Sequence, residues 1–268
     1  MYPRIRYRMT QDNLEYIGKD LEAMHFAQAY RTWVLELIRP YLGKNIVEVG
    51  AGTGSFSRLL LETQPTHLTL VEPSAMFEAL SAELSQHRGP AQVKLFHDLF
   101  SNVADEIRGQ GPPDSIVYIN VLEHIDDDIK ELELAHQTLS PDGRIVLFVP
   151  ALPLLYSKFD RHIGHHRRYR RSDLKTKCEA AGFKVLMIRW FDSAGVLPWL
   201  VKFRLLRSMK VEPAAVRLYD RFAVPITRKV ENLISPPFGK NLLLIGETGD
   251  RYQEAKIRLT SRRSSGVR

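Results

Sequence analysis

Short apolar segments alternate with longer amphipathic ones through most of the chain. Runs rich in Val, Ile and Leu predict buried strands, and apolar positions three and four residues apart predict helices between them. Strands separated by helices form βαβ units, in which the strands are parallel and the crossovers right-handed. We therefore expect an α/β fold with a mostly parallel sheet. The predicted strands are 46–49, 68–71, 93–96, 115–119, 144–149, 183–190 and 241–246, and the predicted helices are 55–63, 74–87, 126–139 and 172–181.

Two stretches depart from this alternation. Residues 12–40 have apolar side chains at helical spacing and predict two helices ahead of the first strand, and residues 191–240 predict an inserted helical pair, or lid, before the last strand. Within the insertion, 196–210 combines Trp and Leu with Arg and Lys, which suits contact with a membrane surface or a lipid-like substrate. We favour the alternative that its apolar stripe packs on the domain, because most amphipathic helices do so.

The same pattern divides the chain into segments. We expect an N-terminal helical segment, a core, the helical insertion, the last core strand and a basic tail without regular structure, at 1–40, 41–190, 191–240, 241–248 and 249–268.

Charge is concentrated at the two ends of the chain. The formal net charge is +7, of which residues 1–10 contribute +3 and residues 250–268 contribute +4. The part between them is formally neutral and offers no basic groove, so we expect no nucleic-acid partner.

Cysteine content and hydropathy bear on the compartment. The single cysteine, Cys178, excludes an intrachain disulfide and a thiolate-rich metal site, and we expect it to fill an apolar helix position. No apolar segment follows the N-terminal arginines as a secretory signal would require. The uncharged run 145–157 has thirteen residues, fewer than the roughly 20 that cross a bilayer. We expect a cytoplasmic protein with, at most, peripheral membrane contact.

A glycine-rich turn follows the first predicted strand. Gly50, Gly52 and Gly54 stand at alternate positions between a strand and a helix, which is typical of a loop that approaches a nucleotide-like ligand closely. Ser55 stands where the dinucleotide fingerprint has its last glycine, so a nicotinamide cofactor is disfavoured. Glu72 ends the second strand, about twenty residues beyond the first glycine, where a carboxylate can accept ribose hydroxyls.

Together with three later segments, these motifs resemble the class I S-adenosylmethionine-dependent methyltransferases. The matching segments are 47–54, 72–73, 98–99, 120–125 and 139–144, in the order and spacing of that family. The resemblance implies a Rossmann-like, seven-stranded, mostly parallel sheet and S-adenosylmethionine as cofactor. It places Glu48 near the methionine part of the donor, Glu72 at the ribose and Asp98 at the adenine amine. The residues expected to bind the cofactor are Glu48, Gly50, Ala51, Gly52, Gly54, Glu72, Pro73, Asp98, Leu99, Asn120 and Val121.

The pair Glu123-His124 raises the question of a metal. In some methyltransferases of catechol and ubiquinone pathways, an acid three residues before such a pair completes a site for a divalent ion. Asn120 stands at that position here and lacks the charge that a hard cation prefers, so we expect no metal. His124 remains a candidate for contact with the substrate or for capping the next helix.

Histidine and arginine are interleaved in residues 159–174, which follow the fifth strand. In the family this segment commonly borders the acceptor. Histidine is readily tuned to act as a base near neutral pH, and arginine binds phosphate or carboxylate groups. The candidates for a catalytic role are His162, His165, His166 and Tyr169, and those for acceptor binding are Arg167 and Arg168. A metal site made of the three histidines is disfavoured by the five arginines nearby. A solvated basic loop is the plainer alternative.

We therefore expect an S-adenosylmethionine-dependent methyltransferase of the type that acts on bacterial small-molecule or lipid-linked acceptors. Its activity would be O-methylation of a small, lipid-linked or glycan-linked acceptor that carries a negative charge. The alternatives are N- or C-methylation of a secondary metabolite and, less favoured, a nucleic-acid-modifying enzyme or a nicotinamide-dependent Rossmann protein.

Overall fold

A computed structural model describes residues 27–249 of the chain. The first helix expected within residues 12–40 and the basic tail from residue 250 lie outside the described residues. The second expected helix is present as α3 (Gln28–Ile38) and packs Trp33, Val34 and Ile38 into the core.

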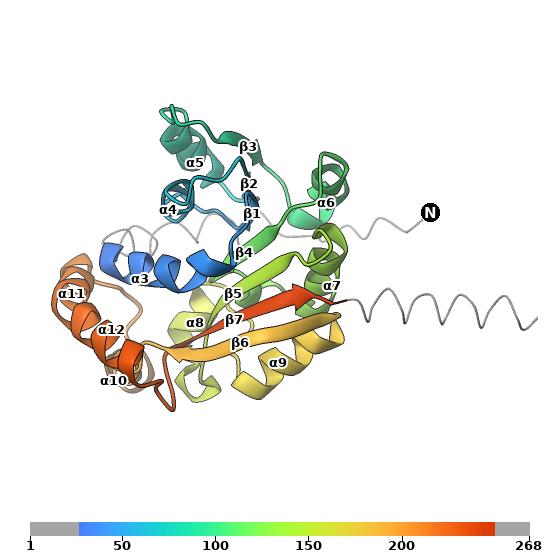
Figure 1. The fold of residues 1–268 in the computed structure, drawn as a ribbon. Helices are drawn as coiled ribbons and strands as arrows, with labels where there is room; N and C mark the ends of the chain where they lie inside the picture. The colour runs from blue at the N-terminus through green and yellow to red at the C-terminus, as the bar shows by residue number, and fades with distance from the viewer. Residues whose placement is uncertain (1–26, 250–268) are drawn as a thin grey trace, which may run out of the picture.

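A seven-stranded sheet with the order β3-β2-β1-β4-β5-β7-β6 forms the centre of the molecule (Figure 1). The first five strands are parallel, and β7 pairs antiparallel with both β5 and β6. The predicted seven-stranded, mostly parallel sheet is confirmed. The strands are β1 (Asn45–Val49), β2 (His67–Val71), β3 (Gln92–Phe96), β4 (Ser115–Ile119), β5 (Arg144–Pro150), β6 (Phe183–Phe191) and β7 (Asn241–Thr248).

Helices cover both faces of this sheet. One buried cluster, which includes Leu132 and Cys178, lies between the sheet and α6, α7 and α9; the other, which includes Trp33 and Leu80, lies between the sheet and α3, α4 and α5. Cys178 is fully buried, as expected. The helices are α4 (Ser57–Leu61), α5 (Phe77–Leu84), α6 (Phe100–Gly109), α7 (Asp128–Thr138), α8 (Lys158–His162) and α9 (Arg171–Ala180), with short 3₁₀ turns η1 (Arg39–Tyr41), η2 (Leu122–His124) and η3 (Pro153–Leu155).

Helix α6 is absent from the sequence prediction. Phe100, Val103, Ala104 and Ile107 are all buried and follow the spacing of one helix face. The apolar pattern that identifies this helix was therefore present in the sequence.

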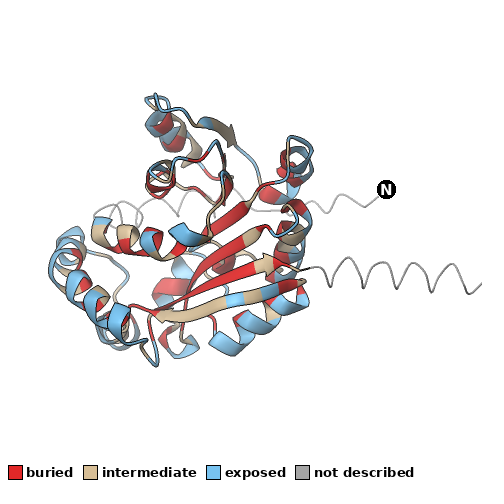
Figure 2. Ribbon diagram, viewed as in Figure 1, coloured by how far each residue is buried: buried red, intermediate tan, exposed pale blue. Residues whose placement is uncertain are grey.

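The helical insertion lies between β6 and β7, as expected. It consists of α10 (Val196–Trp199), the π-helical η4 (Leu200–Leu205), α11 (Pro213–Leu218), the π-helical η5 (Tyr219–Ala223) and α12 (Val224–Leu233). Its helices form the orange group beside α3 in Figure 1. In Figure 2 they are mostly exposed, whereas the central strands are buried. Within the described part of the chain, we find no helix with the length and apolar character needed to cross a membrane.

Candidate functional site

The carboxyl ends of β1, β2 and β4 meet at one edge of the sheet, and the glycine turn lies there. Gly50, Gly52 and Gly54 have φ angles of 71°, 58° and 83°, in the left-handed region that glycine adopts without strain. The N–H of Gly50 donates to the carbonyl of Val71 at 2.8 Å. A Cβ on Gly50 would lie 2.5 Å from Cγ2 of Val121. The turn is thus packed closely against the residue that follows β4.

Glu72 joins the end of β2 to the glycine turn. Its carboxylate accepts the N–H of Gly52 at 2.7 Å on one oxygen and the N–H of Ser74 at 2.9 Å on the other. Each oxygen can accept a further hydrogen bond, because a carboxylate oxygen has two lone pairs. A ribose hydroxyl pair therefore fits the carboxylate without breaking this arrangement.

Glu48 lies within β1 and is 2 % exposed. Its carboxyl accepts a hydrogen bond from Oγ of Ser57 at 2.5 Å, in the first turn of α4. Burial raises the pKa of Glu48 to about 8, because the charged form loses its hydration. Near neutral pH the group is therefore mostly protonated, and its contact with the methionine part of the donor remains a prediction.

Asp98 lies at the start of α6 and is exposed. Its Oδ1 accepts the N–H of Leu99 at 2.7 Å and Nδ2 of Asn102 at 2.6 Å. Beside it, the rings of Phe77 and His97 stack with their centroids 4.4 Å apart. Asp98 therefore orders the first turn of α6, and an adenine contact remains a prediction.

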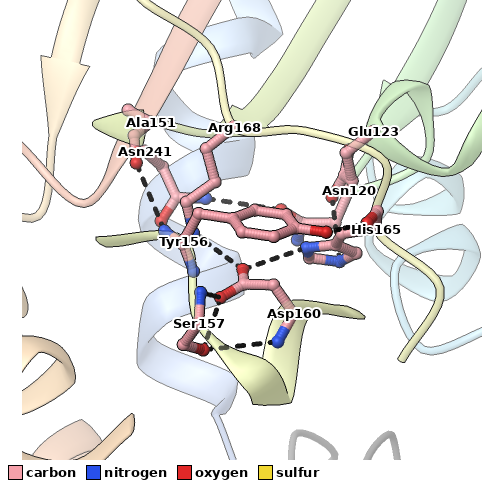
Figure 3. Close-up of polar contacts among 9 residues, drawn as sticks. All are labelled: Asn120, Glu123, Ala151, Tyr156, Ser157, Asp160, His165, Arg168 and Asn241. Carbon is pink, nitrogen blue, oxygen red and sulfur yellow. Dashed lines mark hydrogen bonds and ion pairs between the residues drawn. The ribbon is translucent and has the colours of Figure 1, made fainter. Parts of the chain in front are cut away.

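Asn120 directly follows β4 and has a φ of 54°, which is uncommon for a residue other than glycine. Its Oδ1 accepts Nδ2 of Asn241 at 3.3 Å, and Oδ1 of Asn241 accepts the hydroxyl of Tyr30 at 3.0 Å. The contact between Asn120 and Asn241 is drawn in Figure 3. This chain of hydrogen bonds fixes the end of β4 against β7 and α3.

Asp160, in α8, is the centre of a buried polar network on the other side of this edge (Figure 3). Its carboxylate accepts the N–H of Ser157 at 2.9 Å, Nε of Arg168 at 2.7 Å and a contact from Nδ1 of His165 at 3.2 Å. Asp160 is fully buried. Its pKa is lowered, because the hydrogen bond from His165 and the charge of Arg168 outweigh the effect of burial. The group is therefore ionised and orients both His165 and Arg168.

Glu123 and His124, in η2, lie against His165. Glu123 is fully buried, and neither carboxyl oxygen has a hydrogen-bond partner among the described residues. Its Oε1 is 3.8 Å from Nε2 of His165, and the rings of His124 and His165 meet edge to face at 4.6 Å. Burial raises the pKa of Glu123 to about 8 and lowers the pKa of His124 to about 3; it also lowers the pKa of His165. Both imidazoles are therefore neutral near pH 7.

The same three residues form a set that could ligate a cation. One carboxyl oxygen and one nitrogen from each ring lie within 4.8 Å of one another. Carboxylate and imidazole are ligands that zinc accepts, and a carboxylate on the far nitrogen of a histidine commonly orients such a ligand. This set differs from both ligand sets considered from the sequence, because it combines Glu123 and His124 with His165 in place of residue 120.

A family comparison identifies the chemistry that this edge serves. The model of a methyltransferase domain family matches residues 22–188, more than half of the chain. The chain belongs to this methyltransferase family. It is therefore an S-adenosylmethionine-dependent enzyme, and the nicotinamide interpretation has no support.

Solved structures agree with the fold of this methyltransferase. An S-adenosylmethionine-dependent methyltransferase from Archaeoglobus fulgidus has 18% sequence identity and a TM-score of 0.51, and the match covers 82% of this chain and 94% of that one. The YcgJ protein from Bacillus subtilis has 15% identity and a TM-score of 0.52, with 81% and 98% covered. The cyclopropane synthase MmaA2 from Mycobacterium tuberculosis has 16% identity and a TM-score of 0.52, with 80% and 81% covered. No curated protein matches the sequence.

The donor expected for this methyltransferase fits the edge formed by the glycine turn. The closely packed turn and the free lone pairs of Glu72 suit the ribose and methionine parts of S-adenosylmethionine. When bound, S-adenosylmethionine supplies a methyl group activated by a sulfonium charge. The predicted cofactor residues gather at this edge; they are Glu48, Gly50, Ala51, Gly52, Gly54, Glu72, Pro73, Asp98, Leu99, Asn120 and Val121.

On the acceptor side, the burial and hydrogen bonds of Tyr169 are incompatible with its predicted catalytic role. It is 2 % exposed, and its hydroxyl lies 2.9 Å from Oδ2 of Asp128 and 3.2 Å from the carbonyl of Leu122. Burial and the charge of Asp128 raise its pKa far above the ordinary value. The phenol belongs to the core and cannot serve as a base near neutral pH.

Arg167 and Arg168, predicted to bind the acceptor, both make contacts within the protein. Nη1 of Arg167 is 2.8 Å from Asp128, and Nη2 donates to the carbonyl of Asp126 at 2.7 Å. Arg168 is 6 % exposed and is held by Asp160 and by the carbonyl of Ala151. Both guanidinium groups thus have partners within the protein, and their contact with an anionic acceptor remains a prediction.

The three histidines predicted as catalytic lie in different surroundings. His162 is exposed at the end of α8, and His166 is exposed with its Nδ1 3.7 Å from Asp126. The side chain of His165 joins the buried network. The catalytic roles of His162 and His166 remain predictions.

Two residues that the structure places at the site, Glu123 and Asp160, were not among the predicted site residues. Glu123 was considered only as a metal ligand, and its burial without a partner is visible only in the fold. Asp160 has a sequence signal, because Ser157 and Asp160 form a capping box at the start of α8. The sequence does not show that the same carboxylate reaches His165 and Arg168.

Proposed function

We propose that this methyltransferase transfers its methyl group to a hydroxyl oxygen of a small, lipid-linked or glycan-linked acceptor, and that His165 is the general base. The observation that carries the proposal is the pair formed by Asp160 and His165 beside the donor edge, with Nδ1 of the ring 3.2 Å from the carboxylate.

The chemistry of O-methylation requires such a base. A hydroxyl group is a weak nucleophile, and removal of its proton as the new C–O bond forms lowers the barrier. Because Asp160 is ionised, it favours a proton on Nδ1 of His165 and leaves the lone pair on Nε2. The lowered pKa of His165 keeps the ring neutral, so it can accept a proton near pH 7.

In the proposed step, the acceptor oxygen gains the methyl group as its O–H bond breaks and the proton passes to Nε2 of His165. Asp160 stabilises the imidazolium that forms. Glu123, with Oε1 3.8 Å from Nε2, lies beside the nitrogen that receives the proton and stays protonated, because its pKa is about 8. His124, whose ring lies against His165, borders the space for the acceptor.

An assay with methyl-labelled S-adenosylmethionine and phenols, glycosides and polyprenyl-phosphate-linked sugars tests this proposal. With an acceptor that is turned over, His165→Gln should lower kcat by about 10²- to 10⁴-fold, the range for loss of a general base. The dissociation constant of S-adenosylmethionine should change less than about twofold, which also shows that the variant is folded. His166→Gln is the matched control and should keep its turnover.

Three results would contradict the proposal. One is full turnover by His165→Gln, and another is a product methylated at nitrogen or carbon, as shown by mass spectrometry and NMR. The third is loss of turnover with EDTA that a divalent ion restores, which would make Glu123, His124 and His165 metal ligands rather than a base and its neighbours.

A further inference from the structure

Most of the exposed large apolar side chains of the described residues lie in the helical insertion. Among residues 27–249, all but three of the exposed large apolar side chains lie between Leu197 and Phe238. Figure 2 shows these helices as mainly exposed beside the buried sheet. Soluble monomers rarely expose a large contiguous apolar patch without a partner for it. The exposed set consists of Leu197, Val201, Leu205, Leu206, Met209, Leu218, Phe222, Ile226, Val230, Leu233, Ile234 and Phe238.

Part of this set forms a regular stripe along α11, η5 and α12. Its members follow one another at intervals of four, four, four and three residues, which places them along one side of a helix. Their exposed fractions lie between 55 % and 86 %. We call this set the apolar stripe; it consists of Leu218, Phe222, Ile226, Val230 and Leu233.

The opposite side of the same helices is fixed to the core. The carboxylate of Asp220 accepts the N–H groups of Ala29 and Tyr30, each at 2.9 Å, at the start of α3. The carboxylate of Glu231 accepts the N–H of Ser193 at 2.7 Å. Because these buried bonds set the rotation of the helices, the apolar stripe faces outward. For 196–210, our expectation that the apolar face packs on the domain is confirmed for the buried Phe203 and wrong for the exposed Leu205 and Leu206.

The first helix of the insertion has an inner face as well. Trp199 lies against Phe159 of α8 and Phe203 of η4, and the guanidinium of Arg168 lies 4.6 Å from the centre of the Trp199 ring. Leu205 and Leu206 are 64 % and 74 % exposed. The insertion thus connects the polar network around Asp160 to the exposed apolar surface.

Exposed cations alternate with the exposed apolar side chains along the insertion. Within 196–240, which the structure describes throughout, Glu212 is the only exposed acidic residue. Two other carboxylates, Asp220 and Glu231, are buried. The exposed cations of the same range are Arg204, Arg207, Lys210, Arg217, Arg221 and Lys229.

We propose that the insertion docks on the surface of an anionic lipid bilayer, with the apolar stripe, Leu205 and Leu206 among the headgroups. Leu and Phe interspersed with Arg and Lys on a helical surface suit this interface, because the apolar groups enter the acyl boundary while the cations meet lipid phosphates. A second copy of the chain fits less well, because two such faces would bring like charges together. The docking does not depend on the identity of the acceptor.

Sedimentation of the full-length protein with sucrose-loaded vesicles tests the proposal. Vesicles of phosphatidylcholine with about one third phosphatidylglycerol should bind the protein, and binding should fall steeply with added salt. Vesicles of phosphatidylcholine alone should bind it at least about tenfold more weakly, because each cation near an anionic surface contributes about a fivefold gain in partitioning. A variant with Leu218→Ser, Phe222→Ser, Ile226→Ser and Val230→Ser should lose at least about tenfold in its partition coefficient.

A matched control uses the three exposed apolar side chains that lie elsewhere, with Ile129→Ser, Leu154→Ser and Leu186→Ser. This variant should partition like the wild type, and both variants should keep the dissociation constant for S-adenosylmethionine. The proposal is wrong if the wild type does not bind anionic vesicles, or if the stripe and control variants bind equally. It is also wrong if light scattering shows a dimer that the stripe variant dissociates while vesicle binding stays unchanged.

Discussion

Replacing Glu48 with Gln would test whether the carboxyl group beneath the glycine turn is protonated in the folded enzyme. Glu48 is 2 % exposed, and burial raises its pKa from 4.5 to about 8. At about 1.4 kcal/mol for each pKa unit, this shift corresponds to at most about 5 kcal/mol. We expect a measured effect of about 2 kcal/mol or more, because proteins relax around buried charges.

The sign follows from proton binding. Between pH 4.5 and about 8, the unfolded chain releases the proton of Glu48 while the folded protein keeps it. The folded state then binds more protons, so the free energy of unfolding falls as the pH rises through this window. Glu48→Gln has no proton to lose and should avoid this part of the fall. Glu123 and Glu131 have raised pKa values of about 8 and about 7, but they are present in both proteins and cancel in the difference.

The assay is urea unfolding of both proteins from pH 5 to pH 9 without S-adenosylmethionine. The stability of Glu48→Gln relative to the wild type should rise by about 2 kcal/mol or more between pH 5 and pH 8.5. Glu133→Gln, at an exposed position, is the control and should show no such trend. A difference between Glu48→Gln and the wild type that stays constant across this range would show that Glu48 is ionised when folded and would refute the reasoning.

Two further substitutions examine the two sides of the site. Gly50→Ala would place a Cβ 2.5 Å from Cγ2 of Val121 at a φ of 71°. It should lower the free energy of unfolding by about 1–3 kcal/mol and weaken S-adenosylmethionine binding in calorimetry. An unchanged unfolding free energy and affinity would show that the turn is not closely packed. Tyr169→Phe should lower the unfolding free energy by about 1–2 kcal/mol through the lost hydrogen bonds and leave kcat unchanged. A large loss of kcat with an unchanged free energy of unfolding would show that Tyr169 has a catalytic role.

The strands illustrate what could be predicted from local sequence. All seven predicted strands are present, and β5 differs from its prediction by the single residue Pro150. Apolar runs bounded by turns carry this information locally, so no knowledge of the fold is needed. Helix α6, which was not predicted, also has a local signal, because its buried apolar residues follow the spacing of one helix face.

The pairing of side chains on the acceptor side could not be predicted from local sequence. Residues 159–174 contain histidines and arginines that look equivalent in sequence, yet His165 and Arg168 meet Asp160 while Arg167 meets Asp128. These pairings depend on how α7, α8 and η2 approach one another across the edge of the sheet. Sequence spacing does not fix such approaches, so it could not separate base candidates from structural residues.

The sequence by itself determined the α/β class, the strands of the sheet, the glycine turn and the methyltransferase family with its methyl donor. Strand and turn propensities act over a few residues, so they can be read locally. Only the tertiary structure decided which titratable groups share a buried site and which face of the insertion is exposed. Burial sets the pKa of Glu123, the approach of η2 places Glu123 against His165, and the buried bonds of Asp220 turn the apolar stripe outward. These are properties of residues brought together from distant parts of the chain, so no local pattern encodes them.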